Sequence, residues 1–379
     1  MIEFFASSLA EICRRSLVTP DRPLRWIMIS NPAAGGFVMR SRRKKCRLAL
    51  EKSLAVATAN PLRKNSGPAK TTAAYGTGTL AACGLVTTDG PGSAAKITGA
   101  LIDEADAELN KIGGESNAAP FYLIITAGGD GTSREALSVL YRAPEYVRTN
   151  TAILRLPMGT GNDGADSPEL AVTLELLIKP SRIEFTPALR LITAPGGQST
   201  NPQGPFLAFN ILSVGLDAFV THMTNKMKGK LPGDFYKLWV DIAALFYDRI
   251  YTVDFFDVKA SDRQGKEILS FREKILLLAV GASGQRTYGS QKKILPDDRN
   301  VCALKQMPLL RKLALKGFFS TGEHIDKPES IMFNAHRVEF SGDNPILAQM
   351  DGETVLLQRE DFPAAIELTD PVIPVLKLE

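Results

Sequence analysis

The chain is poor in the residues that build metal centres and disulfide frameworks. Its 379 residues include only 4 cysteines and 3 histidines. The cysteines, Cys13, Cys46, Cys83 and Cys302, show no paired spacing, and the histidines form no ligand cluster. We therefore expect reduced thiols, no structural zinc and a cytoplasmic location.

Long apolar runs and a strong net charge are also missing. No stretch approaches the roughly 18–20 apolar residues that cross a bilayer. Residues 1–18 contain Glu3 and Glu11 with no basic segment before them, which favours an amphipathic helix over a signal peptide. The net charge of +4 is too low to indicate the basic face of a nucleic-acid-binding protein. With 44% hydrophobic and 23% charged residues, the composition is that of an ordinary globular chain, long enough for two domains.

What the sequence does contain is an apolar segment, residues 121–127, that runs directly into a glycine-rich loop. The loop comprises Gly128, Gly129, Asp130, Gly131, Thr132 and Ser133. Glycines lack a Cβ, so their backbone N–H groups can line an anion nest, and a helix capped by Thr132 or Ser133 would add the positive end of its dipole. A carboxylate at Asp130 then suggests Mg²⁺ among phosphates. Taken alone, such a loop is equally typical of a tight turn.

Three further apolar segments end in the same way. They are residues 24–29, followed by Ser30-Asn31-Pro32-Ala33-Ala34-Gly35-Gly36; residues 85–86, followed by Thr87, Thr88 and Gly92; and residues 151–157, followed by Met158-Gly-Thr-Gly-Asn-Asp163. Polar and glycine residues at the ends of successive strands predict an open parallel α/β sheet that binds a nucleotide along that edge.

These loops, together with a downstream Asp-Gly-Glu, resemble the diacylglycerol kinase catalytic-domain family, which embraces diacylglycerol, sphingosine and ceramide kinases and soluble bacterial lipid kinases. The resemblance rests on Asn31-Pro32-x-x-Gly35-Gly36, Thr88-x-x-x-Gly92-x-Ala94, Gly128-Gly-Asp-Gly-Thr132, Pro157-x-Gly-Thr-Gly-Asn-Asp163 and Asp351-Gly352-Glu353. It runs in order from about residue 26 to the C-terminus. Gly-Gly-Asp-Gly-Thr by itself is shared with NAD kinases and 6-phosphofructokinases, whereas the set of five is far more specific.

The resemblance implies a set of site residues. ATP would be held by Asn31, Gly35, Gly36, Thr88, residues 128–133, Gly159, Thr160 and Asn162. Mg²⁺ would be held by Asp130, which also counts among the catalytic residues, with help from Asp163. The base that takes the proton of the acceptor hydroxyl would be Glu353 in the first place and Asp351 in the second. Without the upstream loops, Asp-Gly-Glu would be typical of a hairpin turn.

The sequence departs from the family at two points. Many members carry a basic residue directly after the first glycine of the Asn-Pro loop, and here Arg40 is the first candidate to supply that phosphate contact. The rest of the run, Arg42, Arg43, Lys44 and Lys45, is more typical of a solvated helix face. Bacterial members also hold a structural Mg²⁺ in an Asp-Gly segment, and Cys302-Ala303 stands at that place. We expect this ion to be absent unless Asp297, Asp298 or Asn300 substitutes.

Together these observations predict two domains. Residues 1–22 would be an N-terminal extension, and residues 23–170 with 359–379 an α/β nucleotide-binding domain. Residues 54–84 would be a surface insertion in which Gly76-Thr-Gly78 is a loop without a ligand. Residues 171–358, with short strands between Gly, Pro and Asp, would form an antiparallel β-sandwich for the acceptor, of the NAD kinase and lipid kinase type. One expected strand spans residues 183–191, and helices are expected between residues 217 and 247.

Three functions fit the sequence. The first is an ATP-dependent lipid kinase that phosphorylates a hydroxyl of diacylglycerol, a sphingoid base, ceramide or phosphatidylglycerol at the inner membrane face. A basic and aromatic patch, Lys226, Lys228, Lys230, Phe235, Tyr236 and Trp239, would suit peripheral membrane contact, although packing within the domain is an equally ordinary use of these residues. The second is a kinase of a soluble acceptor such as NAD, and the third a catalytically silent regulator. Edge strands of the sandwich could pair two chains into a homodimer, although no residue requires it.

Overall fold

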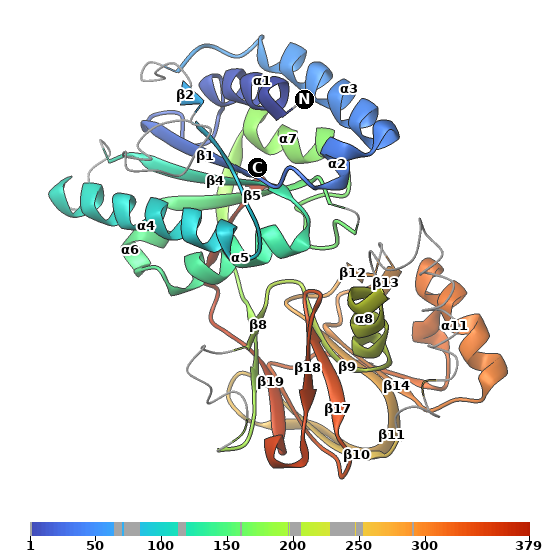
Figure 1. Ribbon diagram of the computed structural model, residues 1–379. Helices are drawn as coiled ribbons and strands as arrows, with labels where there is room; N and C mark the ends of the chain where they lie inside the picture. Colours follow the sequence, from blue (N-terminus) through green and yellow to red (C-terminus); the bar gives the residue numbers. More distant parts are fainter. Residues whose placement is uncertain are drawn as a thin grey trace. The chain divides into compact units, whose positions relative to one another are not determined.

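In a computed structural model, the chain forms two compact units (Figure 1). The structure describes residues 2–63, 70–71, 84–112, 119–159, 161–195, 197, 206–227, 247, 253–289 and 292–379. Unit 1 comprises Met1–Thr186 with Pro371–Glu379, and unit 2 comprises Pro187–Asp370. The chain therefore passes between the units twice. The predicted domain boundaries, after residues 170 and 358, lie earlier in the chain than these crossings.

Unit 1 is built on a seven-stranded sheet in the order β2-β3-β1-β4-β5-β20-β6. All neighbouring strands are parallel except β6, which runs antiparallel to β20. The predicted open parallel α/β domain is confirmed. The strands are β1 Leu24–Ser30, β2 Lys70–Thr71, β3 Gly84–Thr87, β4 Phe121–Gly128, β5 Thr151–Pro157, β6 Ser181–Thr186 and β20 Ile373–Leu378.

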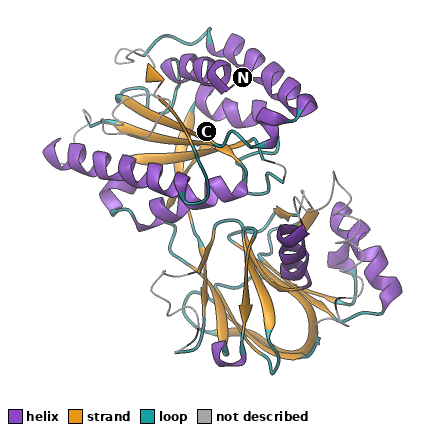
Figure 2. Cartoon of the chain, in the orientation of Figure 1, coloured by secondary structure: helices purple, strands orange, loops and turns teal. Residues whose placement is uncertain are grey.

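Helices lie on both faces of this sheet (Figures 1 and 2). Helices α1, α3 and α7 contact one another, and so do α4 and α5 and α4 and α6 on the other face. The helices are α1 Ile2–Arg14, α2 Gly35–Val38, α3 Arg40–Ala57, α4 Ser93–Ile112, α5 Asp130–Arg142, α6 Glu145–Arg148 and α7 Leu170–Ile178. None of the helices in the described part of the chain is long and apolar enough to cross a bilayer.

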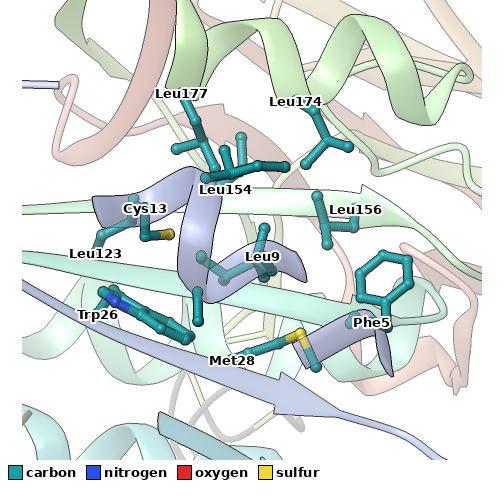
Figure 3. Close-up of a cluster of buried hydrophobic side chains, with 14 of the residues drawn as sticks. Phe5, Leu9, Cys13, Trp26, Met28, Leu123, Leu154, Leu156, Leu174 and Leu177 are labelled. Carbon is teal, nitrogen blue, oxygen red and sulfur yellow. The ribbon is translucent and has the colours of Figure 1, made fainter. Parts of the chain in front are cut away.

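The N-terminal extension is part of the unit 1 core rather than an appendage. Phe5, Leu9 and Cys13 recur at helical spacing along α1, and all are buried. Figure 3 shows them in one cluster with Trp26 and Met28 of β1 and with leucines of β4, β5 and α7. A helix with so much apolar surface must be covered, and α1 covers its own stripe by packing on the sheet.

Unit 2 is an antiparallel β-sheet domain, as predicted for the second half of the chain. Its 11-stranded sheet has the order β18-β17-β9-β11-β10-β16-β19-β7-β8, with β14 and β15 joined through β11. The strands are β7 Leu189–Ile192, β8 Phe206–Ala208, β9 Ile211–Gly215, β10 Phe255–Ser261, β11 Glu267–Gly281, β14 Val301–Lys305, β15 Ser330–Phe333, β16 Arg337–Ser341, β17 Ile346–Met350, β18 Glu353–Leu357 and β19 Ala364–Leu368. A separate ribbon pairs β12 Arg286–Tyr288 with β13 Lys292–Leu295.

Among the described residues of unit 2, the helices are α8 Leu216–Met227 and α11 Leu309–Thr321, with short 3₁₀ turns η2 Glu323–Asp326 and η3 Arg359–Asp361. The expected strand over residues 183–191 is in fact two strands, β6 in unit 1 and β7 in unit 2. Pro187 separates them, since proline has no N–H to continue a ladder. Most of the predicted basic and aromatic patch, from Lys228 to Trp239, lies outside the described residues, as does the Gly76-Thr-Gly78 loop.

Strand β11 shows how the unit 2 core is layered. Its first half pairs with β10 and alternates between exposed and partly buried residues, whereas its second half pairs with β9 and β14 and is buried throughout. Ile275, Leu278 and Val280 join one apolar cluster, and Leu276 and Leu277 join another. An unbroken apolar run is what a strand covered on both faces requires.

Candidate active site

The carboxyl ends of β1, β3, β4 and β5 meet at one edge of the parallel sheet, and the loops that follow are tied together by backbone hydrogen bonds. The Asn31 N–H donates to the carbonyl of Ala127 (3.0 Å), and the Gly36 N–H donates to that of Met158 (2.8 Å). The Asn31 side chain also accepts from the Ala33 N–H at 3.0 Å, which fixes the turn. The loop after β1 therefore contacts the end of β4 and the loop after β5.

The contact between two of these loops depends on a glycine. A Cβ added to Gly159 would lie 2.5 Å from the Cα of Gly129, which is closer than atoms approach in proteins. Gly36 is similarly restricted, because its Cβ would lie 2.7 Å from the Met158 Cε. The glycines in these motifs thus let backbone pack on backbone, in addition to leaving amides open to an anion.

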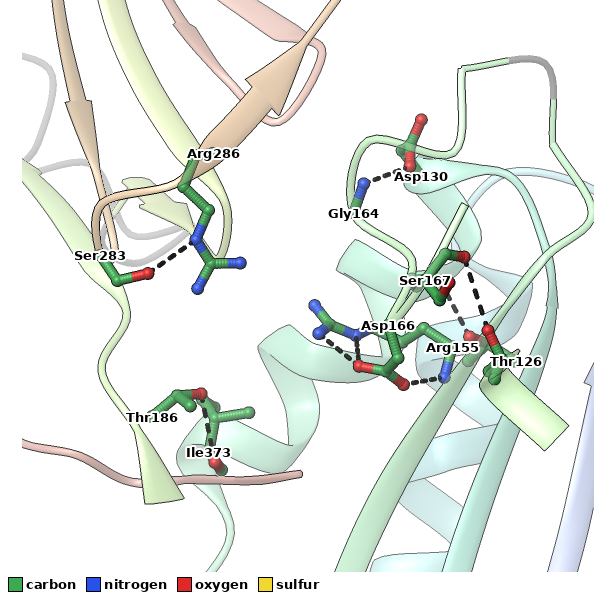
Figure 4. A network of polar contacts seen from close by, with 12 residues as sticks. Thr126, Asp130, Arg155, Gly164, Asp166, Ser167, Thr186, Ser283, Arg286 and Ile373 are labelled. Atoms are coloured by element: carbon green, nitrogen blue, oxygen red, sulfur yellow. Dashed lines mark hydrogen bonds and ion pairs between the residues drawn. The ribbon is translucent and has the colours of Figure 1, made fainter. Parts of the chain in front are cut away.

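Asp130 uses one of its two carboxylate oxygens to hold the loop after β5. Its Oδ1 accepts from the Gly164 N–H at 2.9 Å (Figure 4). A Cβ on Gly161 would lie 3.0 Å from Asp130 Oδ2 and also 3.0 Å from Asp163 Oδ2. Two carboxylate oxygens therefore border the same space, which the missing side chain of Gly161 leaves open.

This arrangement fits a magnesium ion that arrives with a nucleotide. Mg²⁺ prefers oxygen ligands and is commonly held by one or two carboxylates together with substrate phosphates. Within the described residues, no group of three or more His, Cys, Asp or Glu side chains gathers to hold a metal without such help. The predicted pair, Asp130 and Asp163, has the composition expected of a Mg²⁺–ATP site and lacks that of a self-sufficient metal centre.

The start of α5 differs from the prediction. Helix α5 begins at Asp130 with Gly129 as its N-cap and without a side-chain cap, so the expectation that Thr132 or Ser133 caps the helix was wrong. Both residues lie inside the first turn and are buried, and the Ser133 hydroxyl hydrogen-bonds to that of Thr126 at 2.8 Å. An acidic residue at the first helical position suits the positive end of the helix dipole, which favours the earlier start. Gly131 follows in this turn, and Thr160 lies outside the described residues.

Glu135 is a site residue that sequence reasoning missed. From the second turn of α5, its carboxylate accepts from the backbone N–H groups of Gly92 (2.8 Å), Ala94 (3.1 Å) and Ala95 (3.4 Å). Thr88, at the start of that loop, donates its N–H to the Ser30 carbonyl at 2.8 Å. The N-terminus of α4 is thus occupied by a carboxylate of the chain itself. The spacing Thr132-x-x-Glu135 is that of a capping box, which would have assigned Glu135 to its own helix, so the sequence carried no signal for this contact.

Arg155 and Asp166 form a second support that the sequence reading left out. The Arg155 guanidinium donates to Asp166 Oδ1 from Nη2 (2.6 Å) and Nε (3.0 Å), and the Arg155 backbone N–H donates to Oδ2 at 2.6 Å (Figure 4). The two side chains are only 11% and 6% exposed. This pair clamps the far end of the loop after β5 to the strand, and the signal was a lone arginine in an otherwise apolar strand.

The structure brings Arg42, rather than Arg40, onto the nucleotide loops. Arg42 Nη1 donates to the Gly159 carbonyl at 2.6 Å, whereas Arg40 is exposed at the first position of α3. The helical turn places residues two apart on different sides, so only one of the two can face the loops. The role of Arg40 as a phosphate ligand stays a prediction.

In unit 2, Asp351 and Gly352 are the two turn residues of the β17–β18 hairpin. Both have positive φ, 47° and 100°, and Met350 pairs with Glu353 across the ladder. Asp351-Gly352-Glu353 therefore does form a hairpin turn, as the motif taken without the upstream loops would predict. The Asp351 carboxylate accepts from the backbone N–H groups of Phe209, Asn210 and Ile211. Glu353, by contrast, is exposed at the first position of β18.

A buried polar network of side chains from β17, β9 and α8 holds this hairpin turn in place. The Gly352 N–H donates to Gln349 Oε1 (3.1 Å), and Gln349 Nε2 donates to the Ser213 hydroxyl (2.9 Å), which donates to Asp217 at 2.7 Å. Asn225 of α8 donates to the Gly352 carbonyl at 2.7 Å. The turn that presents Glu353 is therefore fixed from β17, β9 and α8.

Comparison with known proteins finds a family similar to most of unit 1. The family model of the diacylglycerol kinase catalytic domain matches residues 25–180. This part of the chain is therefore similar to that domain, and it contains all four strand-end loops of unit 1. No curated protein matches the chain at a significant level.

Solved structures agree on the fold over nearly the whole chain. Three structures from Bacillus anthracis str. Sterne are similar to this one: two of a proposed diacylglycerol kinase (17% identity each; TM-scores 0.54 and 0.52) and one described as of diacylglycerol kinases (15%; TM-score 0.50). Each match covers 93% of this chain and 94–96% of the other. At such low identity the likeness establishes a common fold only, a parallel α/β unit together with an antiparallel β-sheet domain.

In unit 2, the residues considered for a structural ion have protein partners. Asp297 accepts from Arg299 Nε (2.9 Å), which lowers the pKa of the carboxyl, and Asp298 accepts from Gln285 at 2.7 Å. Asn300 exchanges two hydrogen bonds with the backbone of Ala335. Cys302 is fully buried, and burial raises the pKa of its thiol to about 12. The absence of the structural ion stays a prediction.

Proposed function

We propose that the chain is an ATP-dependent lipid kinase that transfers the γ-phosphoryl group of ATP to a hydroxyl of diacylglycerol or a related lipid. The observation that carries the proposal is the pair of carboxylate oxygens, from Asp130 and Asp163, that border the space beside Gly161. They lie at the strand-end loops of the part of the chain that is similar to the diacylglycerol kinase catalytic domain. Phosphoryl transfer needs this combination of anion-binding backbone and a hard-cation site.

In the proposed nucleotide site, the chain mainly positions phosphates and neutralises charge. Gly128, Gly129 and Gly131 would offer backbone amides, with Asn31, Gly35, Gly36, Thr88, Gly159, Thr160 and Asn162 completing the ATP contacts. Arg42 fixes the carbonyl of Gly159 and adds a positive charge beside the loop after β5. Asp130 and Asp163 would hold Mg²⁺, which supplies charge neutralisation at the phosphates when it is bound.

Glu353 is the residue we assign as the general base for the acceptor hydroxyl. Its exposed carboxylate can take a proton from a bound alcohol, which makes the oxygen a better nucleophile toward phosphorus. Asp351 was the second candidate, and three backbone hydrogen bonds to its carboxylate support a different task for it. We assign Asp351 as a positioning residue that holds the turn in which Glu353 begins its strand.

The test is transfer of labelled γ-phosphate from Mg²⁺–ATP to a panel of acceptors in mixed micelles. The panel contains diacylglycerol, monoacylglycerol, sphingosine, ceramide and phosphatidylglycerol, with NAD as a soluble acceptor. We expect one lipid to be labelled, and we expect Glu353→Gln to lower this labelling by about 10²–10⁴-fold while ATP binding is retained.

Glu267→Gln is the matched control, because Glu267 is also an exposed glutamate at the first position of a strand in unit 2. It should leave the rate unchanged. Labelling of NAD alone would establish a kinase of a soluble acceptor instead. Labelling of no acceptor, with ATP bound, would favour the silent regulator.

A further inference from the structure

A groove on unit 1 combines cations with apolar side chains. It is lined by Phe4 of α1 and by Met39, Arg40, Ser41, Arg43, Lys44 and Arg47 at the start of α3. Arg40, Arg43, Lys44 and Arg47 follow the spacing i, i+3, i+4, i+7, so they share one face of the helix, which spans about 10 Å at 1.5 Å per residue. All four are exposed.

The charge on this face is not balanced by the protein. Among the described residues, no carboxylate pairs with Arg40, Arg43 or Lys44, while Arg47 pairs with Glu51 at 2.8 Å and lies over the Phe4 ring at 4.9 Å. The other basic pairs of unit 1 serve its fold, such as Arg155 with Asp166. Three neighbouring cations without a counter-charge repel one another, which a fold tolerates only at modest cost in solvent and which an anionic partner would relieve.

The position of these cations in the helix also disfavours a purely structural role. Helix α3 has no acidic residue in its first turn, and its N-cap, Met39, makes no side-chain cap. Cations at a helix N-terminus oppose the dipole. The N-termini of two neighbouring helices do have a negative charge beside them. Helix α5 begins with Asp130, and the N-terminus of α4 is bound by the Glu135 carboxylate. Only an external anion would make the α3 terminus comparable to them.

Exposed hydrocarbon beside the cations indicates what kind of anion this is. Val38 is 57% exposed, Met39 46% and Leu48 49%, and they lie just before and along the basic stretch. A basic surface that also presents aliphatic side chains suits the interface of a bilayer, where the cations meet anionic headgroups and the apolar groups enter the acyl boundary. A nucleic acid would use the cations but would leave these side chains in water.

We infer that the face formed by Met39, Arg43, Lys44 and Arg47, together with Phe4, docks on an anionic membrane surface. The inference rests on the proposed lipid kinase function only in that it names the surface from which the acceptor would be taken. It gives α1 and α3 a role beyond the core: α1 supplies Phe4 under the basic face, and α3 supplies the charges.

The test measures binding to vesicles without ATP or acceptor, so it does not depend on catalysis. Sedimentation with phosphatidylcholine vesicles is compared with sedimentation with vesicles containing about one third phosphatidylglycerol. The wild-type protein should bind the anionic vesicles and lose affinity as salt rises from 0.1 to 0.5 M. The triple variant Arg43→Gln, Lys44→Gln, Arg47→Gln should bind roughly 10²-fold more weakly, since each basic residue near an anionic surface contributes about a factor of five.

The matched control removes the same charge elsewhere, in Lys259→Gln, Lys266→Gln, Lys377→Gln, all of which are exposed. It should bind the anionic vesicles like the wild type, and Met39→Gln should weaken binding without changing net charge. Equal loss in both triple variants would reduce the effect to net charge and overturn the inference. So would equally tight binding of the wild type to a short DNA duplex, which the triple variant lost in parallel.

Kinase assays separate this inference from the proposed function. If the chain phosphorylates a dispersed short-chain lipid at the same rate in the wild type and in the triple variant, but the variant is slow only on anionic vesicles, both proposals hold. Vesicle binding without phosphorylation of any lipid would remove the proposed function and leave the docking surface. Phosphorylation that is equally fast on neutral and anionic vesicles in both proteins would remove the docking surface alone.

Discussion

Two motif aspartates, one in each unit, are used in opposite ways. Asp130 gives one oxygen to the Gly164 amide, and its other oxygen borders the space beside Gly161. Asp351 accepts hydrogen bonds from three successive amides and sits at positive φ in a hairpin turn. The first carboxylate is held by the fold and keeps an oxygen for a ligand, whereas the second is mostly occupied in making the fold.

The difference teaches that a carboxylate in a sequence motif has no role until its hydrogen-bond partners are counted. A carboxylate has about four acceptor positions. Where backbone amides fill them, the group stabilises the loop that supplies the amides; where they do not, the group can bind a cation or a proton. On this basis, substitution at Asp130 should affect turnover, and substitution at Asp351 should affect stability.

The largest expected effect is the loss of activity on substitution of Asp130, the aspartate of unit 1. Asp130→Asn keeps an oxygen for the Gly164 amide but loses the charge, so kcat/KM should fall by about 10³-fold. The Tm should stay within about 2 °C of the wild type. Steady-state kinetics and a thermal melt measure both, with Asp103→Asn on the exposed face of α4 as the control. A loss of less than tenfold would show that Asp130 does not carry the metal charge.

The next largest effect is the loss of stability on substitution of Asp351, the aspartate of unit 2. Asp351→Asn places an amide N–H₂ against backbone N–H groups and removes charge-assisted hydrogen bonds, which should lower the free energy of unfolding by about 2–3 kcal/mol. Asparagine tolerates positive φ, so the turn itself is not strained. Urea unfolding measures the change, and Asp343→Asn, exposed in the same unit, should have no effect. An unchanged stability with lost activity would restore Asp351 to the catalytic residues.

A smaller effect sharpens the comparison with a third carboxylate. Glu135 fixes the start of α4 and touches no predicted reacting group, so Glu135→Gln should raise KM for ATP by roughly threefold to tenfold and change kcat less. Glu135→Asp, which keeps the charge, should recover part of the loss. Glu145→Gln, exposed on α6, serves as the control. A fall in kcat with KM unchanged would argue against a positioning role.

The smallest effect is a pH dependence in unit 2. Burial lowers the pKa of His324, whose ring lies 4.6 Å from that of Phe319 and bonds to the Ile294 carbonyl at 2.9 Å. The unfolded chain then binds the proton more readily than the folded one, so stability is present above about pH 6.5 and falls as the pH drops below it, by at most about 1.4 kcal/mol per pH unit. Unfolding midpoints at pH 7.5, 6.5 and 5.5 measure this slope. His324→Gln should flatten it, and His336→Gln should not.

Much of the fold was predictable because its signals are local. Each glycine-rich loop followed an apolar run of strand length, and that pattern is sufficient for a parallel sheet with helices between the strands. The antiparallel domain followed from short strands separated by Gly, Pro and Asp. The start of α5 was missed because hydroxyl residues are good caps, and the sequence alone did not show that an acidic residue at the first helical position would extend the helix by a turn.

The site was predicted less completely, because its supports join residues that are far apart in the chain. Glu135 reaches the amides of residues 92–95, and Asp351 those of residues 209–211; neither pairing leaves a periodic trace in the sequence. Which arginine faces the loops, Arg42 or Arg40, depends on where α3 begins, and the first residue of a helix is the least certain part of any helix prediction. The residues assigned to ATP, Mg²⁺ and the base remain predictions that the experiments above address.

The placement of β20 has a consequence for how the chain is made. Residues 373–378 lie between β5 and β6 and pair with both, so the sheet of unit 1 has a gap until they are added. On the ribosome, unit 2 is complete in sequence by residue 370, while the unit that began first still exposes two open strand edges. Unit 1 is therefore begun first and completed last, and until residue 378 emerges the edges of β5 and β6 are open to pairing with another chain.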